Sequence, residues 1–317
     1  MTARDLLSVQ EAAKLIGISK NTAYNLIKKN KLPSYRIGRK IKVDYQDIQT
    51  FLSQGKTNLL QVSSLDGTRH SPMSYTAAYT FTEKPLIIAG QAVILDILAN
   101  HLNCPPYNIP TLHTYCGCYD GLVSLYKGLV SVASAHLWDG DSDTYNETYL
   151  KSLLPGLGCT GVNLASRMQG FYVAKGNPKK IYEWSDLANK NVTMINRELG
   201  CGVRILIDQK LRKAGIPVDS VNGYEQIEYS HIAGASAVSR GDADVSIGNE
   251  LTALQVPNID FVPLQKERLD IIIPSNIFDT SPIQSMLLIL TNKKFLKEMS
   301  GIGCYDLSQT GKVLIKI

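Results

Sequence analysis

The sequence predicts an α/β protein in two parts, a small helix-turn-helix domain followed by a larger domain of alternating strands and helices. A chain of 317 residues is longer than a single domain with one hydrophobic core usually is, so two or three domains are expected. Residues 1–56 hold eleven lysines and arginines against four acidic residues, a net charge of +7. The remaining 22 basic and 24 acidic residues leave −2, and strand–helix alternation begins at Pro85. This asymmetry predicts a polyanionic partner for the first part alone.

Composition excludes several classes of protein. The chain is 44% hydrophobic and 19% charged, as expected for a globular rather than a disordered protein. No apolar stretch approaches the roughly 20 residues of a membrane span, and residues 1–9 lack the apolar segment of a signal peptide. We therefore expect a cytoplasmic protein without membrane contact. The six cysteines are then expected as free thiols; without paired CxxC motifs, neither a metal site nor a cofactor is expected.

Capping signals predict two short helices in the first domain. Ser8 and Glu11 have the capping-box spacing and precede apolar residues at helical intervals, and Gly17 ends that helix. Ser19 caps a second helix, over 20–29. The Gly-Ile-Ser turn between them makes a helix-turn-helix.

A basic β-hairpin is predicted to follow the second helix as a wing. The extended runs 34–37 and 41–43 flank Gly38-Arg39-Lys40, and Asp44 caps a last helix through Leu52. Asparagine pairs with adenine edges in the major groove, and lysine and arginine reach guanines or phosphates. The predicted DNA contacts are Lys20, Asn21, Thr22, Tyr24, Asn25 and Lys28 on the second helix, and Arg36, Arg39 and Lys40 on the wing.

This stretch, LSVQEAAKLIGISKNTAYNLIKKNKLPSYRIGRKIKVDYQDIQTFL, resembles the excisionase-type, MerR-like winged helix-turn-helix family. The resemblance covers about 50 residues and implies binding to double-stranded DNA. Because one such module reads few base pairs, a homodimer is expected. We place the domain boundaries at 1–56 for the winged helix-turn-helix, 57–84 for a linker with a short helix over 58–63, and 85–317 for the larger domain.

The larger domain shows short apolar strands followed by helices, which predicts parallel sheets. In such sheets ligands bind beyond the carboxyl ends of strands, near helix N-termini. The predicted strands are 86–89, 111–115, 129–135, 171–174, 192–195 and 245–247, and the predicted helices are 92–102, 120–128 and 205–214.

The segment 196–204 (NRELGCGVR) predicts an anion cradle between a strand and a helix. Gly200 and Gly202 allow successive N–H groups to point into one concavity, and Arg204 adds a full positive charge. The helix N-terminus contributes about half a charge more.

The sequence segments around it resemble the periplasmic-binding-protein-like domain that is found fused to helix-turn-helix modules and in some molybdopterin-biosynthesis proteins. They include IIAGQAVILDILANHL (87–102), MQGFYVAKGNP (168–178), NGYEQIEYSH (222–231) and GDADVSIG (241–248). The resemblance covers about 85–310 and implies two α/β lobes, a hinge and a ligand cleft, with 136–139 and 249–254 near the crossings. Relatives of this family bind tungstate and molybdate through serine hydroxyls and main-chain amides.

The chain departs from that family at three ligand positions. Cys118 and Cys201 replace serines, and Val203 replaces a threonine. A thiol donates hydrogen bonds poorly, so a softer, sulfur-type or thiophilic ligand becomes an alternative to a small oxyanion. A thiol at a helix N-terminus beside an arginine is also expected to have a lowered pKa, which opens cysteine-based redox sensing as another alternative. Small buried packing residues are the plain structural interpretation of both cysteines.

The predicted ligand-binding residues therefore lie in this loop and at the points where the chain leaves predicted strands or enters predicted helices. They are Gln91, Cys118, Tyr119, Cys201, Gly202, Val203, Arg204 and His231. Familiar catalytic motifs are missing, and a nucleophile–base pair of Cys201 and His231 is the one arrangement that would suggest an enzyme, so no enzyme is expected. The expected function is a transcriptional regulator whose DNA affinity depends on a small ligand. An excisionase-like architectural DNA-binding protein without a sensing role is the remaining alternative.

Overall fold

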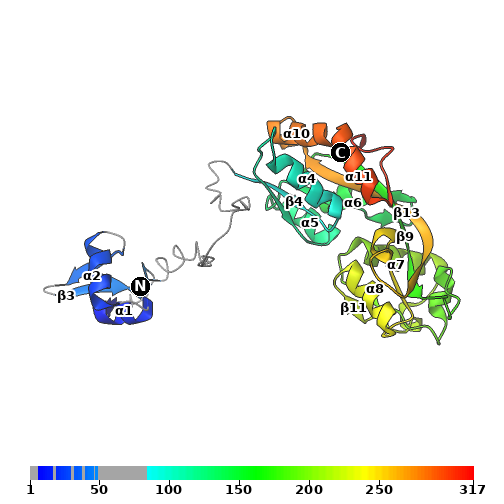
Figure 1. The fold of residues 1–317 in the computed structure, drawn as a ribbon, viewed down its shortest axis with the longest axis horizontal. Coiled ribbons are helices and arrows are strands. Elements are labelled where there is room, and N and C mark those ends of the chain that lie inside the picture. The colour runs from blue at the N-terminus through cyan, green and yellow to red at the C-terminus, as the bar shows by residue number, and fades with distance from the viewer. Residues whose placement is uncertain (1–5, 17–18, 30–31, 38–39, 46, 49–83) are drawn as a thin grey trace, which may run out of the picture. The chain divides into compact units, whose positions relative to one another are not determined.

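The computed structural model describes residues 6–16, 19–29, 32–37, 40–45, 47–48 and 84–317. The chain forms two compact units, Met1–Ala78 and Tyr79–Ile317 (Figure 1). The predicted turn at Gly17, the wing tip with Arg39, most of the last helix of the first domain and the linker lie outside the described residues.

The first unit has the predicted winged helix-turn-helix elements. Helices α1 (Val9–Ile16) and α2 (Lys20–Lys28) precede strands β2 (Tyr35–Ile37) and β3 (Lys40–Asp44). A strand that the sequence did not predict, β1 (Leu6–Ser8), completes an antiparallel sheet in the order β1-β3-β2.

Its local signals act as the sequence predicts. The Ser8 amide donates to the Glu11 carboxylate over 2.7 Å, and the Glu11 amide donates to the Ser8 hydroxyl over 3.3 Å. Ser19 caps α2 by accepting from the Thr22 amide at 3.1 Å. A small core of Ala12, Leu32, Val43 and Ile48 holds these elements together.

The second unit consists of two lobes joined by two long strands. Figure 1 shows β9 (Cys159–Ala174) and β13 (Ile259–Pro274) running between the lobe with α4 and α5 and the lobe with α7 and α8. They pair antiparallel along almost their whole length, with irregularities at Pro263/Gln265 and Leu269/Asp270.

The first lobe packs helices on a mixed sheet. Its strands are β4 (Leu86–Ala89), β5 (Thr111–Thr114) and β6 (Val132–Ala135), followed by the two-residue β7 (Trp138–Asp139) and β8 (Thr144–Tyr145). Its helices are α4 (Val93–Asn103), α5 (Cys118–Tyr126), α6 (Glu147–Leu153), α10 (Ser281–Leu290) and α11 (Lys293–Ile302). Strands β14 (Tyr305–Asp306) and β15 (Val313–Lys316) add to β9.

The second lobe is built around α7 (Gly202–Ala214), α8 (His231–Arg240) and α9 (Glu250–Ala253). Its short strands are β10 (Asn196–Arg197), β11 (Ile227–Glu228) and β12 (Val245–Asn249). Separate buried clusters fill the lobes, one between α4, α10 and the sheet, another between α7, β9 and β12.

The sheet corrects one expectation. Strands β5, β4 and β6 are parallel as predicted, but β13, β9 and β12 all pair antiparallel. The sequence predicted only the last four residues of β9 and none of β13, because charged and amide side chains interrupt the apolar run in the middle of both. Those polar positions lie where the strands cross between the lobes.

Candidate ligand-binding site between the two lobes

The carboxyl ends of parallel strands in both lobes face the same junction. In the first lobe, Gln91 follows β4, Cys118 begins the helix after β5, and His136 follows β6. In the second lobe, Arg197 ends β10 and His231 begins α8 after β11. Ligands of open α/β sheets bind at such strand ends.

The two lobes touch across this junction. The Tyr119 amide donates to the Gly200 carbonyl over 3.1 Å, and Nη2 of Arg197 donates to Oε1 of Gln91 over 3.3 Å. A Cβ added to Gly202 would lie 2.5 Å from the His136 ring, so only glycine permits this approach. The lobes are therefore closed on each other.

A second set of contacts joins α7 to the loop after β6. Lys213 Nζ donates to the Gly140 carbonyl over 2.6 Å, and Arg212 pairs with Asp141 at 2.6 Å. Lys210 lies 4.0 Å from the centre of the Trp138 ring, a favourable cation–π contact. These contacts stabilise the closed arrangement from outside the junction.

Glu267 is the centre of a buried charged cluster. It lies on β13 and is 1% exposed. Its Oε2 accepts from Nε of Arg167 at 2.6 Å and from Nε2 of Gln169 at 2.8 Å, and its Oε1 lies 2.7 Å from Nδ1 of His136. The carboxylate thus joins the two hinge strands to each other and to His136 of the first lobe.

The cluster fixes the charges of its members. Burial raises the pKa of Glu267, but the positive Arg167 and His136 outweigh burial and hold this pKa well below its usual range. Burial lowers the pKa of His136, but the neighbouring Cys118 and Glu267 outweigh it and raise this pKa to about 10. At neutral pH Glu267 is therefore ionised and His136 is an imidazolium.

His231 behaves in the opposite way. Burial and the positive charges of Arg197 and Arg167 hold its pKa well below the usual value, so its imidazole is neutral. Glu267 and His136 also act on this ring, which shows that the members of the cluster lie within electrostatic reach of one another.

Arg197, like Arg167, is a buried positive group with a free donor at this junction. Its side chain is 1% exposed and donates to the Glu198 carboxylate at 2.9 Å and to the Glu228 carbonyl at 3.1 Å. Five buried atoms of the cluster have no hydrogen-bond partner among the described residues: Arg167 Nη2, Gln169 Oε1, Arg197 Nη1, His231 Nδ1 and His136 Nδ1, the last of which has only its ion pair with Glu267. Unpaired buried polar groups are uncommon in proteins. Several of them in one cluster indicate that a bound polar ligand supplies the missing hydrogen bonds.

Two guanidiniums and an imidazolium concentrate positive charge in this cluster. Arg167, Arg197 and His136 face the carboxylates of Glu267 and Glu198, and His136 also faces the Cys118 thiol, whose negative form stabilises the imidazolium. A small anion bound there would be neutralised in surroundings of low dielectric constant, where Coulomb attraction is strong.

The predicted loop lies at the junction, but two of its side chains face elsewhere. Nη1 of Arg204 donates to the Arg197 carbonyl at 3.1 Å, and its guanidinium lies 4.2 Å from the centre of the Tyr224 ring. Val203 is fully buried in the core of the second lobe. Thus Arg204 supports the loop, and Arg197 supplies the guanidinium with a free donor.

The expected acidity of Cys201 is wrong. Its thiol is 3% exposed, and burial raises its pKa to about 11, outweighing the nearby Arg197. Cys118 is also buried and contacts His136. Gln91, Tyr119, Gly202 and His231 lie at the junction, and their roles as ligand contacts stay predictions.

Sequence reasoning missed Arg167, Gln169, Arg197 and Glu267 as members of the site. For the first two, the available signal was the arginine and glutamine that, with Asn163 and Ser166, interrupt the apolar run VNLASRMQGFYV. Arginine and glutamine two positions apart on a strand share one face, so a common partner was to be expected.

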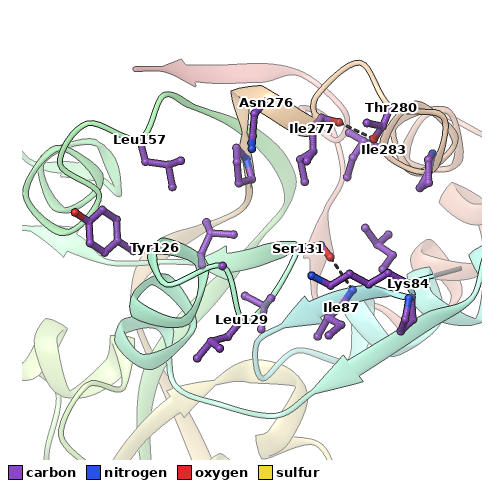
Figure 2. Close-up of a pocket in the computed structure, with 17 residues that line it drawn as sticks. Lys84, Ile87, Tyr126, Leu129, Ser131, Leu157, Asn276, Ile277, Thr280 and Ile283 are labelled. Carbon is purple, nitrogen blue, oxygen red and sulfur yellow. Dashed lines mark hydrogen bonds between the residues drawn. The ribbon is translucent and has the colours of Figure 1, made fainter.

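Among the surface hollows outside this cluster, two lie in or beside the first lobe's sheet and the seam between the lobes. One of about 340 Å³ follows the seam between the lobes and is lined by Tyr119, Leu199 and Arg204 among others. Figure 2 shows another of about 480 Å³, lined by Lys84, Leu129 and Ile283 among others, at the amino ends of β4 and β6. It is therefore at the opposite end of the sheet from the predicted site residues.

The DNA-contact candidates lie on the first unit. All six predicted side chains of α2 are exposed: Lys20, Asn21, Thr22, Tyr24, Asn25 and Lys28. The backbone of Arg36 and Lys40 lies in β2 and β3, while their side chains and all of Arg39 lie outside the described residues.

Comparison with known families agrees with this division. Residues 6–56 match a helix-turn-helix domain, and residues 99–291, more than half of the chain, match the PBP superfamily domain. The chain belongs to the PBP superfamily. Both family resemblances and the two-part α/β fold predicted from the sequence are thereby confirmed.

The relatives of this PBP superfamily member include YvgK of Bacillus subtilis (strain 168), an uncharacterized protein. The two are 35% identical over 309 residues, which cover 98% of this chain and 97% of YvgK. An uncharacterized protein from the 5′ region of a 2Fe-2S ferredoxin gene of Clostridium pasteurianum is 42% identical over 113 residues, which cover 36% of this chain and 100% of the relative.

Solved structures share the fold at low sequence identity. A substrate-binding protein from Clostridium perfringens with bound phosphate has a TM-score of 0.52 at 13% identity, covering 70% of this chain and 99% of its own. A hydrogen-peroxide-bound mutant of OxyR from Corynebacterium glutamicum has a TM-score of 0.51 at 14% identity, covering 93% of this chain and 89% of its own.

Within the part of the chain that the structure describes, no helix combines the length and apolar character needed to cross a membrane. The same residues contain no group of three or more His, Cys, Asp or Glu side chains arranged to hold a metal ion.

Proposed function

We propose that this protein is a cytoplasmic transcriptional regulator, without enzymatic activity, whose helix-turn-helix domain binds double-stranded DNA and whose interlobe junction binds a small anion. The observation that carries the proposal is the buried cluster of charged groups with free donors on the guanidiniums of Arg197 and Arg167. A buried guanidinium with an unpaired N–H is costly unless a bound group accepts from it. The exposed polar face of α2 and the excess of basic residues in 1–56 support DNA as the partner of the first domain.

Lobe closure is the proposed link between ligand and DNA. The closed junction depends on the Arg197–Gln91 and Tyr119–Gly200 hydrogen bonds between the lobes, beside the contact of His136 with Glu267 on the hinge. An anion that neutralises Arg197 favours this closed form over an open one, and it shifts the equilibrium only by that difference in affinity. In a homodimer, closure would change the spacing of the two DNA-binding domains.

The direct test measures DNA affinity with and without an anion. Operator sequences would be selected from random DNA with the full chain, and their dissociation constants measured by fluorescence anisotropy at fixed ionic strength. A specific anion is expected to change the affinity at least about fivefold, the usual scale of allosteric coupling. DNA affinity that no bound anion alters would instead favour an architectural DNA-binding protein.

A second candidate, a cysteine-based sensor, is favoured by the contact between Cys118 and the His136 imidazolium. In that case hydrogen peroxide would oxidise the Cys118 thiol to a sulfenic acid with release of water. The Cys201 thiol would then displace a second water to form a disulfide. The raised pKa of Cys201 makes Cys118 the first thiol to react.

If the protein is a cysteine-based sensor, oxidation should protect Cys118 and Cys201 from labelling by a maleimide. Peroxide treatment followed by a maleimide under denaturing conditions would leave Cys118 and Cys201 unlabelled together. Cys159, which is buried in the same hydrophobic cluster as Cys118 but at the start of β9, is expected to react as before. Unchanged labelling of both cysteines would exclude this second candidate and leave the anion sensor unaffected.

A further inference from the structure

The cluster contains a buried acceptor as well as donors, and this restricts the ligand. Gln169 is fully buried on β9, and its Nε2 donates to Oε2 of Glu267 over 2.8 Å. An ionised carboxylate only accepts hydrogen bonds, so the amide cannot be turned around without losing this contact. The carbonyl end of the amide is therefore fixed as the free end, and Oε1 has no donor among the described residues.

The free acceptor belongs to the same cluster as the free donors. Arg167 and Gln169 are two positions apart on β9, which places them on one face of the strand, and both contact Oε2 of Glu267. Nη2 of Arg167 is a free donor on that shared face. Nδ1 of the neutral His231 ring is also buried without a partner among the described residues, and it donates or accepts according to the ring's tautomer.

No donor of the cluster is bonded to the Gln169 carbonyl, although Nη2 of Arg167 and Nη1 of Arg197 are themselves unpaired. Nε of Arg167 is used by Glu267, as is the His136 ring, and Nε of Arg197 is used by Glu198 and Glu228. A guest that only accepts hydrogen bonds would satisfy the free arginine N–H groups and leave the Gln169 carbonyl unpaired. A guest that accepts and also donates would satisfy both kinds of group.

We propose that the junction selects anions that keep a proton, with hydrogen phosphate as the simplest example, and rejects tetrahedral oxyanions that have lost all their protons. This inference rests on the proposed anion site and names its ligand class. Sulfate, molybdate and tungstate carry no proton at neutral pH, whereas hydrogen phosphate and monosubstituted phosphates or phosphonates in their protonated form keep a hydroxyl group. The tungstate- or molybdate-type ligand that the family resemblance suggested would leave the buried Gln169 acceptor without a partner.

The sharpest probe pair is hydrogen phosphate and monofluorophosphate, because fluorine replaces the hydroxyl group at nearly the same size and charge. Both would be titrated into the full chain by isothermal calorimetry at neutral pH, with sulfate as a third probe. Hydrogen phosphate is expected to bind at least about tenfold more tightly than either, because one unpaired buried acceptor costs about this factor.

A variant assigns the selectivity to one side chain. Gln169→Met keeps the length of the side chain and removes the acceptor, so the preference for hydrogen phosphate over monofluorophosphate is expected to fall toward one. Gln265→Met is the matched control, because this amide also lies on the hinge strands but donates to the Tyr145 hydroxyl at 2.6 Å. The control is expected to keep the full preference.

The outcomes separate the two proposals. Equal affinity of the unaltered chain for hydrogen phosphate, monofluorophosphate and sulfate overturns the selectivity and keeps the anion site. Preference for hydrogen phosphate that persists in Gln169→Met overturns the assignment to this residue. Failure of all three anions, of molybdate and of methylphosphonate to bind overturns the anion site itself.

Discussion

Replacing Arg197 by methionine is expected to weaken anion binding about 100-fold or more while the domain stays folded. The side chain is buried at the junction, and its Nη1 is a free donor. Truncating one member of a buried, hydrogen-bonded charge pair typically costs about 2–5 kcal/mol in binding. The loss would be measured as the shift in melting temperature that hydrogen phosphate or sulfate produces, since a bound ligand stabilises the folded state by mass action.

Arg240→Met is the control for this experiment. Arg240 lies in the same lobe and pairs with Asp242 at 2.7 Å, but both side chains are more than half exposed. It is expected to keep the full ligand-induced shift. Circular dichroism of Arg197→Met would verify its fold, and anion binding retained by a folded Arg197→Met would mean that the free donor at the junction is not used.

Adding one methyl group at Gly202 is expected to hold the lobes apart. The new Cβ would lie 2.5 Å from the His136 ring of the opposite lobe, closer than non-bonded carbon atoms tolerate. Overpacking of this kind costs about 1–3 kcal/mol, and here the cost falls mainly on the closed form. Gly202→Ala should therefore weaken anion binding roughly 5- to 150-fold and reduce the compaction that the ligand produces in small-angle X-ray scattering.

Gly301→Ala is the matched substitution, because a Cβ there meets nothing within 4 Å. It is expected to behave like the unaltered chain in both measurements. If Gly202→Ala also bound and compacted normally, the close approach of His136 to α7 would not limit closure.

The sequence predicted the elements whose signals are local. The capping box of Ser8 and Glu11, the cap at Ser19 and the wing strands depend on residues a few positions apart, and such patterns are visible in one chain. The three parallel strands of the first lobe were found in the same way, from short apolar runs followed by helices. These are the features that neighbouring residues determine.

The rest depends on residues distant in the chain. Glu267 meets Arg167 and Gln169 across about 100 positions and His136 across about 130, and no local pattern marks such partners. Arg204 looked like the anion-binding guanidinium because it begins the helix after a glycine loop. The fold instead directs it to the Arg197 carbonyl and the Tyr224 ring. Tertiary packing therefore decides which of the two nearby arginines, Arg197 or Arg204, keeps a free donor for a ligand.

The pairing of β9 with β13 restricts the number of residues that each of these two strands can gain or lose. Side chains of a strand alternate between its two faces, so a shift of one residue in one strand would turn Arg167 and Gln169 away from Glu267 and bring Met168 to their place. Single-residue insertions or deletions in this double-stranded hinge should therefore destroy the cluster even when both lobes fold. Changes of two residues preserve the facing, so length variation among descendants of this chain should accumulate in the loops of the lobes and spare the hinge.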